Sequence, residues 1–466
     1  MYKNLALIQL PHFFGDGYSR PPECYPLGLG YISSVLKQHD IPHEGIDLWG
    51  EQLTEDGALK SVNFSRFDVI GISAYSTQYR YLKTFTMKLK NQYPDIPIVC
   101  GGPGPTFSHD IILKNTGVDI CVLSEGENTF IELIENINNP EKVRGVAFLK
   151  NGEVALTLKR DPVENLDILP MPNRELFDFE KIINTANQVR INSENGNDSY
   201  TSRRAADMIA GRGCPYFCNY CSKTFDGLRL RSVDNIAAEI VELKNRYRIN
   251  HIAFNDELVL VNKKRTIQFC DKLKTLNVTW SCQGRINQVD REVLIAMKDA
   301  GCTEVGYGVE SISQNILDAM NKKINAESVV PVVKMTKEVG IKPVIQYMYG
   351  YPGENDRTIA NTIKFFKEID YPYVSFTTTP LPGTKLYEDC KEKGLIADEE
   401  RYLMKLDSGY NMDRPLVNLT DFTDEEFLSK KRKLQIKIIH NYLKKRPLTY
   451  MRFISNFIGK RIKNYF

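Results

Sequence analysis

The cysteines at positions 214, 218 and 221 stand close together in a stretch that also contains Gly211, Gly213 and Pro215. Thiolates are soft ligands that bind zinc or iron–sulfur clusters. A structural zinc site normally has four protein ligands, but here the next cysteine is Cys270 and no histidine is nearby. Three thiolates therefore favour a four-iron cluster with one iron open to another ligand.

The same spacing could also mark the buried stripe of a helix. Gly211, Gly213 and Pro215 argue against a helix, because glycine and proline break helices or precede them. We therefore expect this stretch to be a cluster-binding loop.

The pattern Cys-x-x-x-Cys-x-x-Cys, with Tyr220 before the last cysteine, resembles the radical S-adenosylmethionine (radical SAM) superfamily. The resemblance implies a [4Fe-4S] cluster held by Cys214, Cys218 and Cys221, whose open iron binds the amino and carboxylate groups of SAM. It also implies an external one-electron reductant, of the flavodoxin or ferredoxin type, that allows SAM to be split into a 5′-deoxyadenosyl radical.

The chain of 466 residues is long enough for two or three domains. Its net charge of +3 predicts no strong preference for nucleic acid. Seven of its ten cysteines are scattered outside the motif, which is typical of free thiols in a reducing cytosol. No stretch reaches the ~18 apolar residues of a membrane span, and the first apolar run is too short for a signal peptide. We expect a cytoplasmic protein.

Residues 1–140 alternate short apolar runs with segments whose apolar residues recur at helical spacing. The runs cover residues 5–10, 43–47, 68–73, 96–101 and 118–123. This alternation predicts an α/β fold with a flavodoxin-like (Rossmann-type), doubly wound sheet. Such sheets bind ligands beyond the carboxyl ends of their strands.

Glycines and small hydroxyl residues follow these strands, and they allow backbone amides to approach a bulky polar ligand. Each one alone could simply form a tight turn. Together they resemble the cobalamin (B12)-binding domain that precedes many radical SAM domains. The resemblance implies that cobalamin contacts Leu27, Gly28, Ser73, Tyr75, Ser76, Thr77, Gly101, Gly102, Glu125 and Gly126.

The chain departs from this family at one position after the first strand. Relatives that bind cobalt through histidine carry Asp-x-His-x-x-Gly there; His12 and Gly15 have that separation, but Leu10 replaces the aspartate. A ligating histidine normally needs a partner on its other ring nitrogen. We therefore expect cobalt to have no histidine ligand, and His12 could equally be a solvated loop residue.

Residues 141–205 are expected to connect two domains. Asn151-Gly152 lies between two apolar runs and predicts a hairpin. The proline-containing segment 166–174 predicts an extended linker, and the polar segment 191–203 predicts a surface loop.

Residues 206–385 again alternate strand and helix patterns. The expected strands cover residues 207–210, 251–254, 279–282, 304–307, 344–349 and 373–378. Six strand–helix units fit the partial (β/α)6 barrel that the superfamily implies. A barrel places its working residues at the carboxyl ends of its strands.

Polar residues follow these strands too. The resemblance implies SAM contacts at Tyr220, Asn255, Asp256, Glu257, Arg285, Glu310 and Gly350. Glu310 would meet the ribose hydroxyls and Arg285 the carboxylate. The Gly-Gly-Glu usual after the second strand is absent, which leaves the amino-group contact open among residues 255–257. Arg285 and Glu310 could instead form an ion pair at the barrel rim.

Residues 386–466 predict a helical, basic C-terminal region. No acidic residue follows Glu426, and apolar residues such as Ile438, Ile439 and Phe453 are interleaved with lysines and arginines. Such a helix can lie on an anionic membrane surface, which would hold the protein at the inner face of the membrane. It can also pack its apolar side on the barrel, and the sequence leaves both alternatives open.

These observations predict a cobalamin-dependent radical SAM enzyme that methylates an unactivated carbon of a small-molecule or lipid-like substrate. One alternative is a related enzyme that performs cyclisation, ring contraction or oxidation without methyl transfer. Another is a non-catalytic iron–sulfur protein for redox sensing or binding. A methylthiotransferase would need a second cysteine trio, for which Cys24, Cys100 and Cys121 are the candidates. No catalytic residue beyond the cofactor contacts is singled out.

Overall fold

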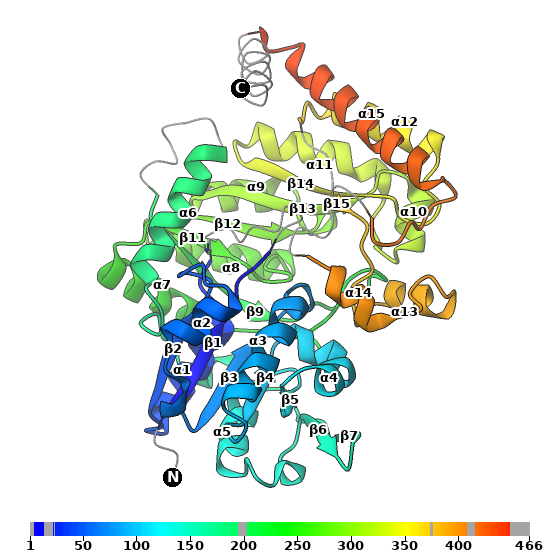
Figure 1. Ribbon diagram of the computed structural model, residues 1–466. Helices are drawn as coiled ribbons and strands as arrows, with labels where there is room; N and C mark the ends of the chain where they lie inside the picture. Colours follow the sequence, from blue (N-terminus) through cyan, green and yellow to red (C-terminus); the bar gives the residue numbers. More distant parts are fainter. Residues whose placement is uncertain are drawn as a thin grey trace, which may run out of the picture.

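The computed structural model describes residues 4–13, 22, 24–193, 203–372, 376–407 and 415–447. Two mainly parallel sheets lie one beyond the other, the first from the N-terminal third of the chain and the second from its middle (Figure 1). Near the described C-terminal end, helix α14 (Glu399–Lys405) contacts α3 (Tyr79–Gln92) of the first sheet, and the last described helix, α15 (Asp424–Leu443), lies beside the second sheet (Figure 1).

The first sheet has the strand order β2-β1-β3-β4-β5-β6-β7. Its parallel strands are β1 (Leu5–Gln9), β2 (His43–Asp47), β3 (Val69–Ser73), β4 (Ile98–Gly101) and β5 (Ile120–Val122). Its helices are α1 (Leu27–Gln38) and α5 (Glu127–Glu135) on one face, and α2 (Glu55–Ser61), α3 (Tyr79–Gln92) and α4 (Pro103–Asn115) on the other. The five predicted strands and the flavodoxin-like arrangement are confirmed.

The predicted hairpin is also present, and it extends the first sheet. Strands β6 (Val146–Lys150) and β7 (Glu153–Leu156) pair antiparallel, and β6 pairs antiparallel with β5. Asn151 and Gly152 have φ values of 55° and 84°, which a type I′ turn requires at both central residues. The sheet therefore continues past residue 140, where the sequence pattern suggested that it ends.

The segment between the two sheets is packed against both of them. Phe177 and Phe179 belong to the same buried cluster as Leu133 of α5 and Trp280 of the second sheet. Helix α6 (Phe179–Ser193) follows. One continuous core thus joins the two sheets. Most of the predicted surface loop, residues 194–202, lies outside the described residues.

The second sheet consists of six parallel strands in the order β15-β14-β13-β12-β11-β8. They are β8 (Ala205–Met208), β11 (His251–Phe254), β12 (Thr279–Gly284), β13 (Cys302–Glu310), β14 (Lys342–Tyr349) and β15 (Phe376–Thr377). The predicted partial barrel is confirmed, although residues 373–375 of its last predicted strand lie outside the described residues.

Helices cover the outer face of the second sheet (Figure 1). They are α7 (Val233–Tyr247), α8 (Lys263–Lys274), α9 (Arg291–Asp299), α11 (Ala326–Glu338) and α12 (Asp356–Glu368), whereas the short helix α10 (Gln314–Ala319) packs at the carboxyl end of the sheet, against Tyr351 and Leu386. Burial alternates along β12 and β14, as expected for strands with one tightly packed face. Gln283 and Gln346 are on the less buried face, where the amide of Gln346 donates to the Gln283 oxygen at 3.1 Å. The inner face of the barrel is therefore partly polar.

Helices α13 (Lys385–Glu392), α14 (Glu399–Lys405) and α15 (Asp424–Leu443) complete the described chain. Helix α15 packs along α12 and buries Phe427, Leu434, Ile438 and Leu443. For these residues the structure favours packing on the barrel over exposure to a membrane. None of the described helices is both long and apolar enough to cross a membrane. Phe453 and the residues after it lie outside the described part of the chain.

Phe427 attaches α15 to the carboxyl end of β14, so replacing it should destabilise the protein. Its ring lies 4.8 Å from that of Tyr349, and a Cβ on Gly350 would come within 2.4 Å of it. We expect Phe427→Ala to lower the free energy of unfolding by roughly 3–5 kcal/mol. Ile436→Ala on the same helix is the control, because Ile436 is 59% exposed and should change stability by at most about 0.5 kcal/mol. Urea denaturation measures both; equal effects would contradict the packing of α15.

Candidate active site

The cysteine motif lies in a loop that a two-stranded ribbon closes. Strand β9 (Gly211–Arg212) pairs antiparallel with β10 (Arg229–Leu230), and residues 213–228 form the loop between them. Gly213 has a φ of 82°, and a Cβ there would come within 1.8 Å of the Gly227 carbonyl oxygen. Only glycine fits such a position. The prediction of a loop rather than a helical stripe is confirmed.

The three thiols of this loop suit an iron–sulfur cluster by their chemistry. Cys214 and Cys218 are half-buried and Cys221 is more exposed, and none of the ten cysteines forms a disulfide. Desolvation by surrounding protein atoms raises the pKa of Cys221 to about 11, and Glu257, Cys218 and Cys214 add to the shift. The thiols are thus electrostatic neighbours. Within the described residues, no three His, Cys, Asp or Glu side chains are gathered in a geometry that would already hold a metal ion.

Glu310 ends β13 in an unusual backbone conformation. Its φ is 63°, and the register between β13 and β14 shifts between Gly308 and Glu310. A positive φ is rare outside glycine and marks a locally constrained site. The carboxylate Oε1 lies 3.2 Å from Lys322 Nζ, which donates to the Tyr220 hydroxyl at 2.8 Å. Glu310 and Lys322 are buried, so the end of β13 is tied to the cysteine loop.

Lys322 was not among the predicted site residues. It follows the short helix α10, about a hundred residues from Tyr220 in the chain. Burial raises the pKa of Tyr220, and the charge of Glu310 adds to the shift, so the tyrosine remains a neutral partner for the lysine. A charged side chain that is buried next to a predicted ligand could be found only from the three-dimensional structure.

Arg285 follows β12 and lies against the same loop. Its guanidinium carbon is 3.7 Å from the ring centroid of Tyr216, and Nη1 donates to Cys218 Sγ at 3.9 Å. Nη2 donates to the Lys322 carbonyl oxygen, while Nε is buried with no partner among the described residues. A buried donor without a partner is costly, so it fits an acidic ligand. The expected alternative, a pair with Glu310, is not formed, since Glu310 pairs with Lys322.

The three residues after β11 have different surroundings. The Asn255 amide donates to Asp207 at 2.7 Å, and Glu257 lies near Cys221 and Lys223. Asp256 is buried and accepts the Ala210 N–H at 2.7 Å. Burial raises the pKa of Asp256 to about 7. Its carboxyl thus stabilises the bend before the ribbon, and the expected contact with SAM stays a prediction.

Gly350 also has a structural role beyond the one expected. Its φ is 86°, and the Phe427 ring fills the space in front of its Cα. Its N–H donates to the buried carboxyl of Glu354 at 3.1 Å. Packing under α15 alone is sufficient to require glycine at this position.

The expected cobalamin contacts gather at the carboxyl edge of the first sheet. Because β1, β3, β4 and β5 are parallel, the residues that follow them share this edge. Gly102 has a φ of 98°, and a Cβ there would come within 3.0 Å of the Ala74 carbonyl oxygen. Gly28 has open space in front of it, and Tyr75 is 52% exposed. Leu27, Ser73, Ser76, Thr77, Gly101 and Gly126 are half-buried around the same edge.

His12 is not the solvated loop residue that the sequence allowed. Its ring centroid lies 4.5 Å from that of Trp49 and 5.6 Å from that of Tyr75. Burial lowers the pKa of His12 to about 4, so the imidazole is neutral at physiological pH. Gly15, the other residue of the comparison with histidine-ligated relatives, lies outside the described residues.

Glu125 joins the first sheet to the ribbon that closes the cysteine loop. Its carboxylate forms ion pairs with Arg229 and, at 3.6 Å, with Arg212, and it accepts the Val163 N–H at 2.9 Å. Next to it, the Ser124 hydroxyl donates to the Thr224 carbonyl oxygen of the cysteine loop at 3.1 Å. The carboxyl edge of the first sheet therefore meets the cysteine loop directly.

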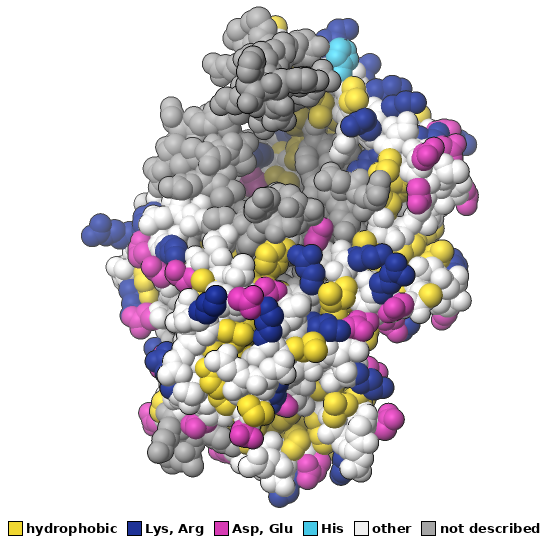
Figure 2. Space-filling view, in the orientation of Figure 1, with side chains coloured by type: hydrophobic (Ala, Val, Ile, Leu, Met, Phe, Trp, Pro, Cys, Tyr) yellow, Lys and Arg dark blue, Asp and Glu magenta, His cyan; other side chains and the backbone are white. Residues whose placement is uncertain are grey.

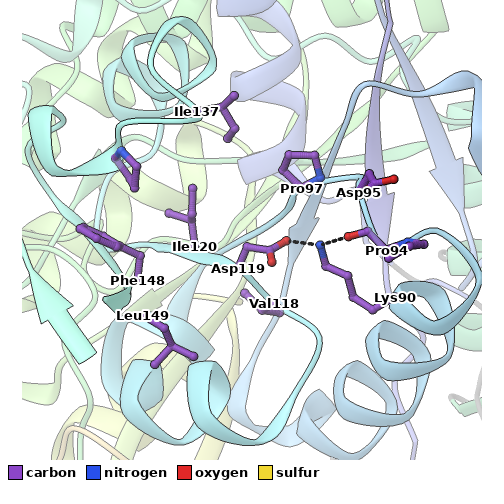
Figure 3. Close-up of a pocket in the computed structure, with 11 residues that line it drawn as sticks. Lys90, Pro94, Asp95, Pro97, Val118, Asp119, Ile120, Ile137, Phe148 and Leu149 are labelled. Atoms are coloured by element: carbon purple, nitrogen blue, oxygen red, sulfur yellow. Dashed lines mark hydrogen bonds and ion pairs between the residues drawn. The ribbon is translucent and has the colours of Figure 1, made fainter. Parts of the chain in front are cut away.

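Two cavities of about 390 Å³ each lie on the first sheet. One is at the opposite, amino-terminal edge, where Lys90 pairs with Asp119 at 2.7 Å and donates to the Pro94 carbonyl oxygen (Figure 3). Two of its polar side chains, Lys90 and Asp119, bind each other at the edge of the sheet opposite the one that meets the cysteine loop. The other is lined by Thr106, Ser124 and residues 223–226, so it borders the cysteine loop.

Two family models match the chain. The radical SAM superfamily matches residues 208–366, and the B12 binding domain matches residues 17–134. The first match covers most of the second sheet with its cysteine loop. The second covers the parallel part of the first sheet beyond β1.

Relatives match most of the chain. An uncharacterized methyltransferase of Pyrococcus horikoshii is 30% identical over 422 residues, covering 88% of this chain and 87% of the relative. The anaerobic magnesium-protoporphyrin IX monomethyl ester cyclase of Rubrivivax gelatinosus is 25% identical, covering 88% and 76%. Among solved structures, a similar one is the radical S-adenosylmethionine methyltransferase TsrM of Kitasatospora setae, with cobalamin and a [4Fe-4S] cluster bound. Its TM-score is 0.68 at 15% sequence identity, and the match covers 85% of this chain and 79% of the TsrM chain. At this low sequence identity, the similarity to TsrM shows a shared fold only.

The low pKa of His12 predicts a specific loss of stability in acid. Its folded-state pKa of about 4 lies below the ordinary value of 6.5, so between these values the unfolded chain binds more protons than the folded one. Stability should therefore fall as the pH is lowered from 6.5 towards 4. The variant His12→Phe keeps a ring between Trp49 and Tyr75. We expect its free energy of unfolding to fall less steeply over this pH range. Urea denaturation at several pH values measures the slopes, and identical slopes would contradict the burial of a neutral imidazole.

Proposed function

Since the chain belongs to the radical SAM enzymes that carry a B12-binding domain, we propose that it methylates an unactivated carbon of a small-molecule or lipid-like substrate. The observation that carries the proposal is the direct contact of the first sheet's carboxyl edge with the cysteine loop. When bound, a [4Fe-4S] cluster with SAM would supply the radical that activates the carbon, and cobalamin would supply the methyl group. One substrate could then reach both the cluster with SAM and the cobalamin.

Within this proposal, Cys214, Cys218 and Cys221 hold the cluster. Arg285 and Lys322 place two cations beside the loop, where they would balance the carboxylate of SAM, and Arg285 Nε has no hydrogen-bond partner in the described part of the chain. Glu310 would accept hydrogen bonds from the ribose hydroxyls. Its positive φ and its pair with Lys322 hold its carboxylate in one orientation.

The remaining predicted SAM contacts have different surroundings, and we propose a different role for each of them. Asn255 and Glu257 are exposed at the carboxyl end of β11 and stay candidates for the amino group. The carboxyl of Asp256 is turned to Ala210, so it would act by supporting the loop. Tyr220 would act through Lys322, and Gly350 would contribute backbone only.

For cobalamin, we propose that the glycine and hydroxyl residues after β3 and β4 surround the corrin and its side chains. Gly28 leaves open space at the start of α1. His12 is packed between Trp49 and Tyr75, and no carboxylate stands at position 10 to orient its ring. Both observations support cobalt without a histidine ligand from the protein. Glu125 would act through its ion pairs with the ribbon that closes the cysteine loop.

A second function in the same class is cyclisation or oxidation without methyl transfer. It is supported by the similarity to the Rubrivivax gelatinosus cyclase, which covers 88% of this chain. Family membership argues against a purely redox-sensing or binding role. Cys100 and Cys121 are buried in neighbouring strands and Cys24 is exposed, which argues against the second cysteine trio of a methylthiotransferase.

Labelled SAM distinguishes the two enzymatic functions. Anaerobically reconstituted protein is reduced and incubated with deuterated-methyl SAM and a small-molecule extract of the source cells. We expect 5′-deoxyadenosine and a product that carries the deuterated methyl group, both detected by mass spectrometry. Products without label would instead indicate cyclisation or oxidation.

Cysteine variants provide the matched control for this experiment. Cys218→Ala should lose the cluster absorbance and all SAM cleavage, because an open-iron cluster needs each of its three thiolates. Cys24→Ala, at an exposed site outside the loop, should keep both. A Cys218→Ala protein that cleaves SAM at the rate of the unchanged protein would contradict the cluster assignment.

We further propose that the enzyme works in the cytoplasm with a flavodoxin- or ferredoxin-type reductant. Exposed cluster thiols require a reducing compartment, and Cys221 is the most accessible of the three. The reductant would approach the cysteine loop.

Contact with an anionic membrane remains a prediction for the basic C-terminal region. Lys and Arg side chains gather along α15 on the face shown in Figure 2, and each one near a lipid surface contributes about 1 kcal/mol. Sedimentation with vesicles should then require anionic lipid and weaken with salt, because charges are screened beyond ~8 Å at physiological ionic strength. Truncation after residue 447 leaves α15 in place and tests the remaining tail. No pelleting at low salt would end this hypothesis.

A further inference from the structure

Four buried charges lie between the first sheet and the ribbon of the cysteine loop. Arg212 and Arg229 belong to the ribbon, whereas Glu125 and Glu127 follow β5 of the first sheet. Each of the four is at most 9% exposed. Arg212 Nη2 lies 2.5 Å from Glu127 Oε1 and its Nη1 lies 3.6 Å from Glu125 Oε1, which also binds Arg229. We call this set the interdomain charge cluster.

The two arginines are direct cross-strand partners in the ribbon. Like charges directly opposite each other destabilise a pair of strands, and burial of an unpaired charge is costly. The ribbon therefore depends on the carboxylates of the first sheet to hold both guanidinium groups. Burial alone would raise the pKa of Glu125, but the hydrogen bond from Arg229 and the further contacts with Val163 and Arg212 bring it below its usual range. Glu125 thus carries its charge at neutral pH.

Arg212 also contacts the helix that begins beside the expected cobalamin edge. Its guanidinium carbon lies 5.3 Å from the ring centroid of Tyr31 in α1 and 5.3 Å from that of Phe225 in the cysteine loop. One side chain therefore touches α1, the start of α5 and the loop. Arg229 adds a hydrogen bond of 2.7 Å to the Val163 carbonyl oxygen, which attaches the segment between the domains.

A purely stabilising interface would not need these charges. Replacing a buried ion pair with apolar residues is often neutral or stabilising, whereas removing one partner is strongly destabilising. In some proteins, however, buried charged groups fix a single relative position of the elements that carry them. The cluster is thus suited to determine how the cysteine loop sits on the first sheet.

We propose that Arg212, Arg229, Glu125 and Glu127 are positioning residues that hold the cysteine loop at a defined place over the carboxyl edge of the first sheet. This inference rests on the proposed function, because that edge and that loop are where the two cofactors would bind. A misplacement of about 1 Å can lower a rate by about a hundredfold. Loss of the cluster should therefore impair transfer between the two sites more than cleavage of SAM within the barrel.

The test compares two Glu→Gln variants on the same helix. Glu127→Gln keeps the shape of the side chain but removes the charge that faces Arg212. Glu132→Gln is the matched control, because Glu132 pairs with Arg160 and not with an arginine of the ribbon. Hydrogen–deuterium exchange of residues 213–228 is measured in the protein without added cofactors. In the reconstituted enzyme, the ratio of methylated product to 5′-deoxyadenosine is measured.

We expect Glu127→Gln to exchange faster in residues 213–228 and to make at least about tenfold less product per 5′-deoxyadenosine. The control should match the unchanged protein in both measurements. The inference is overturned if Glu127→Gln leaves loop exchange unchanged, or if it lowers overall stability while the product ratio stays the same. If the unchanged protein yields no methylated product, the proposed function fails, and the exchange measurement still decides the role of the cluster in placing the loop.

Arg212→Lys keeps the inference testable if Glu127→Gln does not fold. Lysine retains the charge but cannot contact both carboxylates as the planar guanidinium does. We expect an intermediate exchange rate and an intermediate product ratio. An Arg212→Lys protein that equals the unchanged protein in both measurements would also overturn the inference.

Discussion

Parallel strand pairing is the constraint on which the arrangement of both sites depends. In a parallel sheet every strand ends at the same edge, so residues distant in the sequence are brought to one side without any contact of their own. This arrangement occurs twice in the chain. One edge gathers the residues after β1, β3, β4 and β5, and the other gathers those after β11 to β14. The two edges then meet at the cysteine loop, where Ser124 contacts Thr224.

Three cations lie against the cysteine loop and are held in fixed positions. Arg285 stacks on Tyr216, and Lys322 lies between Tyr220 and Glu310. Lys223 donates to the Cys214 carbonyl oxygen at 2.9 Å and lies over the Phe217 ring. An iron–sulfur centre with three thiolates and an acidic ligand gathers negative charge, and nearby cations stabilise it. Because each cation already has a fixed partner, little reorganisation would be needed when such charge arrives.

Local patterns in the sequence were sufficient for the strands and the cysteine loop. The parallel strands of the first sheet are short apolar runs between polar segments, and the glycines and proline around Cys214 exclude a helix. Contacts between distant residues left no such signal. The pairs Lys322–Tyr220 and Arg212–Glu127 are separated by 102 and 85 positions. Their partners were therefore visible in the sequence only as isolated charged or aromatic residues.

Some of the predicted site residues also make contacts that the sequence did not reveal. Asp256 follows β11 as expected, but its carboxyl is used by the backbone of Ala210. His12 follows β1, yet two aromatic rings from other strand ends enclose it. In both cases burial by neighbours that fold in from elsewhere decided the environment. Burial of this kind depends on three-dimensional packing, which periodicity along one segment does not describe.

Helix α15 illustrates why an amphipathic pattern alone could not decide between a membrane and the barrel. Both surfaces accept an apolar stripe flanked by lysines. The contacts with the barrel explain why α15 packs there. Gly350 leaves room for the Phe427 ring, and the Tyr349 hydroxyl donates to the Phe427 carbonyl oxygen at 3.1 Å. Lys431, which the sequence counts toward the basic face, is buried and binds Thr377. At least one charge that favoured a lipid surface is thus part of the contact with the barrel, and the cationic face is smaller than the sequence suggests.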